Sequence, residues 1–166
     1  MRHVEGYTVR DYLAVRGNHD MKDDYYSIEQ VFRIKAWDFA SAGEASSQIK
    51  KILKQLGIDP ALTRRVTIAA YEAEMNLIIH SVGGEMRLKV TPQFIIVTAE
   101  DRGPGIPDIA LAMQEGYSTA PEIARELGFG AGMGLPNIKR CADRLNIQSS
   151  VGKGTLLEMY FDIKAG

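Results

Sequence analysis

Two polar side chains stand at a spacing that could serve chemistry in the middle of the chain. Glu72 and Asn76 lie four residues apart within the largely apolar stretch 66–79, and residues at this spacing share one face of a helix. A carboxylate can act as a general base, and an amide oxygen can bind Mg²⁺. Taken alone, the pair is explained more simply by the solvent-exposed edge of an amphipathic helix, beside Glu74.

Two glycine-containing segments could bring the backbone close to a ligand. Asp101 begins the sequence Asp-Arg-Gly-Pro-Gly-Ile directly after an apolar stretch, so its acid could hydrogen-bond a ligand that Gly103 and Gly105 let approach. An ordinary turn explains this segment equally. The glycines of 128–135 lead into a predicted helix, where free N–H groups and the helix dipole favour an anion such as phosphate. The alternative there is a flexible linker.

Two familiar phosphate-binding motifs do not fit these glycines. A dinucleotide-binding fingerprint needs a strand before its glycines, whereas a helical pattern at 121–127 precedes them here. A P-loop needs Gly-Lys followed by Ser or Thr, and residues 152–155 read Gly-Lys-Gly-Thr. The joint order is more specific than any one segment: E-x-x-x-N on a helix, D-x-G-x-G after a strand, G-x-G-x-G-L before a helix, and G-x-G-T before a last strand.

The strands that must position these residues follow from alternating hydrophobicity. Residues 31–37, 86–90 and 155–163 alternate apolar and polar side chains, and 94–99 form an apolar, β-branched run. These patterns predict four strands. Short helical pieces are expected near 108–115, in a region rich in glycine.

Three longer helices are predicted from their start signals and periodicity. Ser41 and Glu44 match a capping box at the start of the first. Asp59, followed by proline, begins a second that runs to about His80. Apolar positions within 138–145 predict the third. The resulting order, β-α-α-β-β-α-β, predicts an α+β two-layer sandwich with a mixed, mostly antiparallel sheet and helices on one face.

The composition fits one globular domain and argues against several function classes. The chain has 166 residues, 45% hydrophobic and 25% charged, which suffices for a single core. Its net charge of −1 suggests neither nucleic acid nor membrane as a partner. A single cysteine excludes an internal disulfide framework. Because no long apolar run or signal-peptide pattern is present, a cytoplasmic location is expected.

The first 28 residues differ from the rest. They mix charged residues with tyrosines and show no sustained period. We interpret 1–28 as an N-terminal extension, poorly ordered or loosely attached, before a domain at 29–166. Met21 is an alternative start of the protein.

The four segments in this order resemble the Bergerat-fold, or GHKL, ATP-binding superfamily. Within it the chain is similar to bacterial anti-sigma-factor serine kinases of the RsbT and RsbW/SpoIIAB type. Residues 72–80 resemble the N box of the RsbW branch, whereas 99–106, 112–119 and 134–140 resemble the RsbT branch. The resemblance covers about residues 29–163. Its mixed character leaves the particular partner and the oligomeric state open.

The resemblance implies a Bergerat fold with ATP and Mg²⁺ as cofactors, and it implies residue roles. Glu72 would orient or deprotonate the attacking hydroxyl group, and Asn76 would bind the Mg²⁺ that bridges the ATP phosphates. Asp101 would accept from the adenine amino group, and Thr155 would support the same ring edge. The other implied nucleotide-binding residues lie in the glycine segments and the lid: Gly103, Gly105, Ile106, Ser118, Thr119, Arg125, Gly130, Gly132, Met133, Gly134 and Leu135.

The implied function is that of an ATP-dependent protein-serine kinase and anti-sigma switch protein. Its substrate would be a STAS-domain antagonist, and a sigma factor or another effector would be a second partner. A homodimer is compatible with the RsbW-like features. Two alternatives stay open: an ATP-binding anti-sigma factor that acts mainly by sequestration with little turnover, and a stand-alone histidine-kinase-like ATPase domain.

Overall fold

A single antiparallel sheet forms one layer of the protein. The computed structural model describes residues 27–116, 122 and 134–164. Five strands lie in the order β1-β2-β3-β5-β4, and each of the four neighbouring pairs is antiparallel. Their bounds are β1 Ile28–Ile34, β2 Gly84–Val90, β3 Phe94–Asp101, β4 Arg144–Ser150 and β5 Gly154–Asp162.

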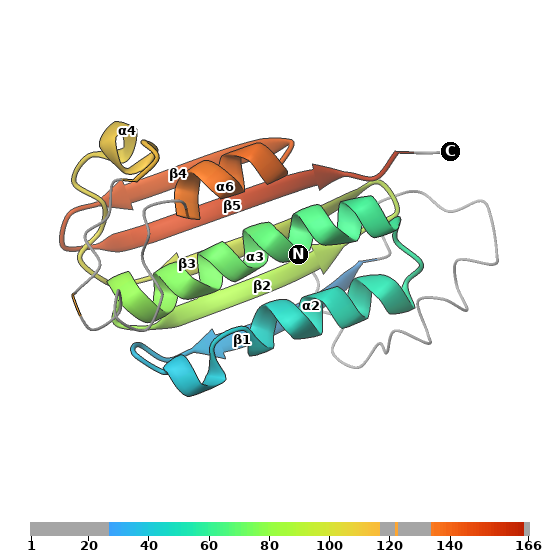
Figure 1. Ribbon diagram of the computed structural model, residues 1–166, viewed down its shortest axis with the longest axis horizontal. Coiled ribbons are helices and arrows are strands. Elements are labelled where there is room, and N and C mark those ends of the chain that lie inside the picture. The colour runs from blue at the N-terminus through green and yellow to red at the C-terminus, as the bar shows by residue number, and fades with distance from the viewer. Residues whose placement is uncertain (1–26, 117–121, 123–133, 165–166) are drawn as a thin grey trace.

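The helices form the second layer. The three longer ones, α2 (Glu44–Gln55), α3 (Pro60–His80) and α6 (Gly134–Cys141), lie side by side over one face of the sheet, with α3 in the middle (Figure 1). Two short pieces complete the described helices, the 3-10 helix η1 (Phe39–Ser41) and α4 (Ile109–Ala112). The predicted α+β sandwich is therefore confirmed. None of the described helices is long and apolar enough to span a membrane.

The core lies between the two layers and follows the predicted alternation. Leu88, Val97 and Met159 face one another across β2, β3 and β5, and each is completely buried. Burial of such a side chain stabilises the fold by about 1.5–3 kcal/mol. On the helix side of the core, α3 contributes a stripe of buried residues that includes Ala70 and Ala73. Their small side chains let the helix lie close to the sheet.

The start of α3 is the one predicted from the sequence. The Asp59 carboxylate accepts hydrogen bonds from the backbone N–H groups of Ala61 and Leu62, at 3.0 and 3.1 Å, and Pro60 occupies the first helical position. This cap satisfies N–H groups that have no partner inside the helix.

The start of α2 differs from the prediction, and the capping box of Ser41 and Glu44 is wrong. Ser41 ends η1, and the N-cap of α2 is Gly43, which has a φ of 92° and makes no side-chain cap. The carboxylate that satisfies this helix end comes from α3. Glu74 Oε1 accepts from the N–H groups of Gly43 and Ala45, at 3.0 and 3.1 Å, and Oε2 accepts from Ser46 at 3.1 Å.

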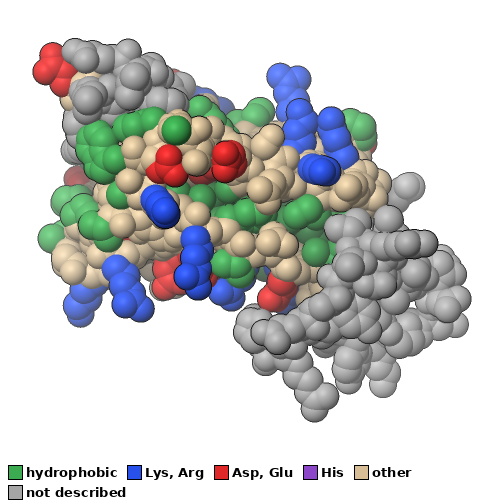
Figure 2. Space-filling view, turned by 90° about the horizontal axis from the view of Figure 1, so that it is seen from below, with side chains coloured by type: hydrophobic (Ala, Val, Ile, Leu, Met, Phe, Trp, Pro, Cys, Tyr) green, Lys and Arg blue, Asp and Glu red, His purple; other side chains and the backbone are tan. Residues whose placement is uncertain are grey.

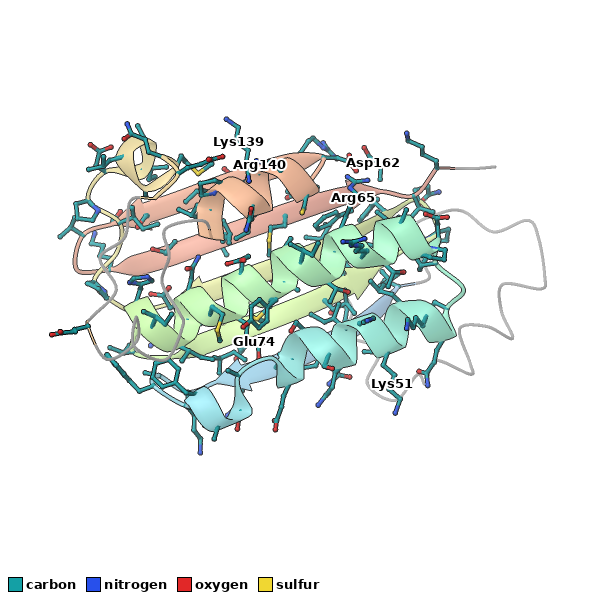
Figure 3. All side chains as sticks on the ribbon, in the orientation of Figure 1. Lys51, Arg65, Glu74, Lys139, Arg140 and Asp162 are labelled. Carbon is teal, nitrogen blue, oxygen red and sulfur yellow. The ribbon has the colours of Figure 1, made fainter. Side chains whose placement is uncertain are left out.

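This carboxylate lies between two helices and away from solvent. Glu74 is only 1% exposed, and Figure 3 shows it between α3 and α2. Burial of a carboxylate is costly unless its oxygens accept hydrogen bonds, and three charge-assisted bonds fulfil that condition here. The expectation that Glu74 belongs to a solvent-exposed edge of its helix is therefore wrong.

Residues 144–150 also differ from the prediction. Helix α6 ends at Cys141, and Leu145 lies in β4 at the edge of the sheet. Only Leu145 and Ile147 of this strand pack against the core, and both are half-buried between exposed polar neighbours. Two apolar residues are too few for a clear alternation, and Leu145 also fits a helical spacing after Cys141.

The first strand is shifted relative to its prediction. It begins at Ile28, inside the predicted extension, where Ile28 pairs with Val90 and is buried. It ends at Ile34, so Trp37 lies beyond it, with a φ of 61° and its side chain 45% exposed. The Trp37 ring contacts Phe39 edge-on, with 5.7 Å between the centroids.

Replacement of Glu74 by glutamine tests the cap. The glutamine keeps the volume but presents an NH₂ group to backbone N–H groups, so at least one buried donor loses its acceptor. We expect the free energy of unfolding in urea to fall by about 2–3 kcal/mol. Glu44→Gln, at an exposed position in the first turn of α2, is the matched control and should cost less than about 1 kcal/mol. Equal effects of the two variants would contradict the assignment.

Candidate functional site

The first cluster of predicted site residues lies where α3 faces the start of α6. A Cβ atom placed on Gly134 would lie 3.3 Å from Asn76 Oδ1 and 3.4 Å from Glu72 Oε2. Both side chains are half-buried and converge on the same backbone position. The spacing of four residues therefore does bring the carboxylate and the amide together, and Gly134 leaves space between them that a larger residue would fill.

A further residue joins this cluster that the sequence analysis missed. The side-chain amide of Asn137 donates from Nδ2 to Glu72 Oε1 at 3.3 Å. Asn137 lies one helical turn after Gly134, in the segment 134–140 that carries the resemblance. Only its place one turn behind the glycines could have indicated a role, because an asparagine on a short helix is unremarkable by itself.

The position of α6 is fixed at its other end by Arg65 of α3. Arg65 Nε donates to the carbonyl oxygen of Cys141 at 3.0 Å, and its guanidinium lies 2.8 Å from Asp143 Oδ1. Asp143 in turn accepts from the N–H of Asp162 at 2.8 Å. This backbone hydrogen bond is the main cause that lowers the pKa of Asp143. Ile138, completely buried, holds the helix to the core.

The donor set of this cluster suits Mg²⁺ held partly by a substrate. In the described part of the chain, no three His, Cys, Asp or Glu residues lie close enough to bind a metal on their own. Mg²⁺ commonly takes one or two protein oxygens and completes its shell with phosphates and water. Asn76 Oδ1 offers one such oxygen beside the N-terminus of α6, where backbone N–H groups favour an anion.

The second cluster surrounds the end of β3. Asp101 pairs with Gly84 of β2 and with Thr155 of β5. Its Oδ1 accepts from the N–H of Gly103 at 2.7 Å. Gly154 has a φ of 111°, and a Cβ there would collide with the backbone oxygen of Asp101. A glycine is therefore needed for β5 to approach the end of β3.

Ser149 links the loop after Asp101 to the last hairpin and was also missed. Its Oγ accepts from the N–H of Ile106 at 2.7 Å and lies 2.8 Å from Thr155 Oγ1. It also lies 3.2 Å from the carbonyl oxygen of Gly154. Ser149 belongs to β4, the strand that the sequence did not reveal, so its pairing with Thr155 could not be predicted.

The two clusters lie along the same end of α3. Ser81, the C-cap of that helix, is 3.1 Å from a Cβ built on Gly103. With a rise of about 1.5 Å per residue, Asn76 is about 7.5 Å and Glu72 about 13.5 Å from Ser81 along the helix axis. One extended ligand can therefore contact both clusters.

The remaining predicted residues divide into two groups. Gly105 lies in the loop tied to the hairpin, and Leu135 packs against the main core. Six others are outside the described residues: Ser118, Thr119, Arg125, Gly130, Gly132 and Met133.

A hollow of about 400 Å³ lies elsewhere, between β1, η1 and the start of α2. It is lined in part by Glu74 and Ile78 and includes none of the predicted site residues. The hollow therefore gives no support to the site described above.

Burial is the main influence on the pKa of the Asp101 carboxyl group. Desolvation raises the pKa of this carboxyl group above its ordinary value, and the neighbouring Glu100 adds to the rise. Hydrogen bonds from the N–H groups of Gly103 and Thr155 act in the opposite direction. The side chain is thus a partly buried acceptor, held in place by the backbone on both sides.

Comparison with known proteins gives consistent matches across this region. The family described as histidine kinase-like ATPase domain matches residues 37–161, which contain both clusters. The serine/threonine-protein kinase RsbT of Bacillus subtilis is 30% identical over 126 residues, covering 74% of this chain and 86% of that protein. An anti-sigma F factor of Pasteuria penetrans is 30% identical over 134 residues, covering 75% and 86%.

The chain is also similar to solved structures. The mycobacterial sensor histidine kinase MprB aligns with 81% of this chain and 97% of its own, with 15% sequence identity and a TM-score of 0.46.

The pH dependence of stability tests the environment of Asp101. Because its pKa is raised on folding, the folded state holds this proton more tightly than the unfolded state. The stability contributed by Asp101 is therefore lost as pH rises from its unfolded pKa through the raised value. We expect the free energy of unfolding of the parent to fall relative to Asp101→Asn across that window. If the free energy of unfolding of the parent instead rises relative to that of Asp101→Asn across this window, the raised pKa of Asp101 is contradicted.

Proposed function

Since the chain belongs to the histidine kinase-like ATPase domain family, we propose that it binds Mg-ATP and transfers the γ-phosphoryl group to a serine of a partner protein. The predicted family is confirmed, and the name of its relative RsbT supports the serine/threonine-kinase class. The observation that carries the mechanism is the convergence of Glu72 and Asn76 on Gly134 at the start of α6.

The first cluster would bind the ATP phosphates and place the general base beside them. Asn76 would bind Mg²⁺ through Oδ1, and the first N–H groups of α6 would donate to phosphate oxygens. The metal would neutralise charge on the phosphates when bound. Glu72, half-buried beside them, would accept the proton of the attacking serine hydroxyl and orient it toward phosphorus. Phosphoryl transfer needs little more than such positioning and charge neutralisation.

The second cluster would select the base. The Asp101 carboxylate is an acceptor fixed by the N–H of Gly103, and the adenine amino group is a donor of matching type. A guanine would place a carbonyl oxygen at that position, and two acceptors facing each other repel. Thr155, whose hydroxyl is held 2.8 Å from Ser149 Oγ, would support the same ring edge. Gly103, Gly105 and Ile106 would line the approach to the base and ribose.

The partner side of the proposal rests on the relatives. We infer a STAS-domain antagonist as the phosphorylation substrate and a sigma factor or another effector as a second partner, in the cytoplasm. Figure 2 shows that the side viewed from below carries both basic and acidic side chains, with several basic ones gathered at the upper right of the view. Lys50, Lys51 and Lys54 are exposed on α2. A homodimer is part of the same hypothesis.

A second candidate is an ATP-binding anti-sigma factor that acts by sequestration with little turnover. The name of the Pasteuria relative, an anti-sigma F factor, favours it. The same nucleotide site would then set the affinity for the partner. A stand-alone histidine-kinase-like ATPase domain is the third candidate, favoured by the family description alone.

Replacement of the proposed general base, Glu72, tests the kinase proposal. Glu72→Gln should lower phosphoserine formation on a STAS-domain protein of the same genome by about 100-fold or more, because glutamine cannot accept the hydroxyl proton. The dissociation constant of Mg-ATP, measured by calorimetry, should change by less than about 3-fold, since binding rests on Asn76 and Asp101. Glu85→Gln, on the outer side of β2 and paired with Arg87, is the control. Parental transfer by Glu72→Gln would remove Glu72 from the mechanism.

The base-recognition step has a separate test. Asp101→Asn should weaken Mg-ATP binding by about 10-fold or more, because a hydrogen bond to a charged acceptor contributes about 1.5–3 kcal/mol. Titration calorimetry of parent and variant with Mg-ATP measures it, and Mg-GTP should bind weakly to the parent. Parental affinity in the variant would exclude Asp101 from the adenine site.

A further inference from the structure

We propose that Asn137 is a positioning residue for Glu72: it holds one carboxylate oxygen so that the other faces the transferred phosphate. This inference rests on the proposed kinase function and adds a residue to it. Asn137 lies on α6, and Glu72 lies on α3, so the contact joins the two helices that form the phosphate side of the site.

The two oxygens of Glu72 have different surroundings. Oε1 accepts the hydrogen bond from Asn137 Nδ2 at 3.3 Å. Oε2 lies 3.4 Å from a Cβ built on Gly134, on the side where Asn76 Oδ1 also lies. A carboxylate offers two acceptor oxygens, so occupation of Oε1 leaves Oε2 to accept the hydroxyl proton beside the metal ligand.

The orientation of the Asn137 amide is fixed by Arg140. The guanidinium Nη1 donates to Asn137 Oδ1 at 2.9 Å. Arginine has no acceptor atom, so the amide oxygen must face Arg140, and the NH₂ group must then face Glu72. A flipped amide would place its oxygen against the carboxylate and its NH₂ group against a cation, which is unfavourable on both sides.

Arg140 has a partner of its own outside α6. Its guanidinium forms an ion pair with Glu115, which follows α4. Figure 3 shows Arg140 on the side of α6 that faces away from α3. The side chains of Arg140 and Glu115 are 51% and 58% exposed, so the pair contributes little to stability. Its effect is to hold the guanidinium where it orients Asn137.

The consequence for catalysis is positional. A general base must lie within hydrogen-bond reach of the proton that it accepts, and small displacements of such a group cost rate steeply. Loss of Asn137 would free the Glu72 carboxylate to rotate. The hydrogen bonds of the Asn137 side chain go to Glu72 and Arg140, whereas the nucleotide would be held through Asn76 and Asp101. Nucleotide affinity should therefore depend little on Asn137.

Two substitutions separate positioning from a purely structural role. Asn137→Asp keeps the shape and improves the contact with Arg140, but it places a carboxylate against Glu72. Asn137→Ala removes both contacts. If Asn137 only supports the helix, the aspartate variant is the milder of the two; if it positions Glu72, the aspartate variant is the more harmful.

The experiment measures transfer of labelled γ-phosphate from Mg-ATP to the STAS-domain acceptor and to water. We expect the single-turnover rate to fall about 10-fold in Asn137→Ala and about 100-fold in Asn137→Asp, with Mg-ATP dissociation constants within about 3-fold of the parent. Asn146→Asp is the matched control, because Asn146 Nδ2 of β4 makes the same kind of contact with Glu158 Oε2 of β5, at 3.1 Å. Its rate should equal that of the parent.

A double-mutant cycle and a nucleotide-free measurement complete the test. In a Glu72→Gln background, Asn137→Asp should add no further loss of rate, since the group that it positions is gone. The side-chain amide signal of Asn137 in a ¹⁵N spectrum should shift in Glu72→Gln and Arg140→Gln but not in Glu85→Gln. If the parent is active and Asn137→Asp transfers phosphate at the parental rate, the positioning role of Asn137 alone is overturned. An Asn137 amide signal that does not shift in Glu72→Gln has the same consequence. A parent that transfers phosphate to neither acceptor overturns the proposed function and this inference together.

Discussion

The carboxylate of Glu74 ties two of the three main helices together from inside the protein. It accepts from three backbone N–H groups at the start of α2, where Gly43 offers no side-chain cap of its own. Without it, those donors would have no acceptor in a place that water hardly reaches, at a cost of about 1–3 kcal/mol each. The position of α2 over the sheet therefore depends on a residue of α3.

The same helix serves the site because its polar residues point in different directions. Successive residues are about 100° apart around a helix, so Glu72 and Asn76 share a face while Glu74, two residues from each, points nearly opposite. Accordingly, Glu74 contacts α2, and Glu72 and Asn76 face α6. Between them, Ala70 and Ala73 pack on the sheet. One central helix thus anchors α2 on one side and, on the other, presents Glu72 and Asn76, the residues of the proposed phosphate site.

The sequence predicted the elements whose signals are local and failed where the partner is distant. The cap of α3 by Asp59 lies within four residues and was predicted correctly. The cap of α2 comes from Glu74, 31 residues after Gly43, and a local Ser-x-x-Glu pattern suggested the wrong residues. Strand β4 has two core-facing apolar residues, so Ser149 and its contact with Thr155 remained hidden. Asn137 of α6 forms a hydrogen bond with Glu72 of α3, and no spacing within the chain reveals such a contact between helices.

The proposed function requires that one Mg-ATP molecule spans both clusters, from Asp101 to the face of Glu72 and Asn76. A crystal structure of the protein with Mg²⁺ and a non-hydrolysable ATP analogue tests it most directly. We expect the adenine amino group within hydrogen-bond distance of the Asp101 carboxylate, the metal bound by Asn76 Oδ1, and the γ-phosphate beside the N-terminus of α6, with Glu72 Oε2 facing it. A nucleotide bound elsewhere, or a metal bound without Asn76, would contradict the proposed site.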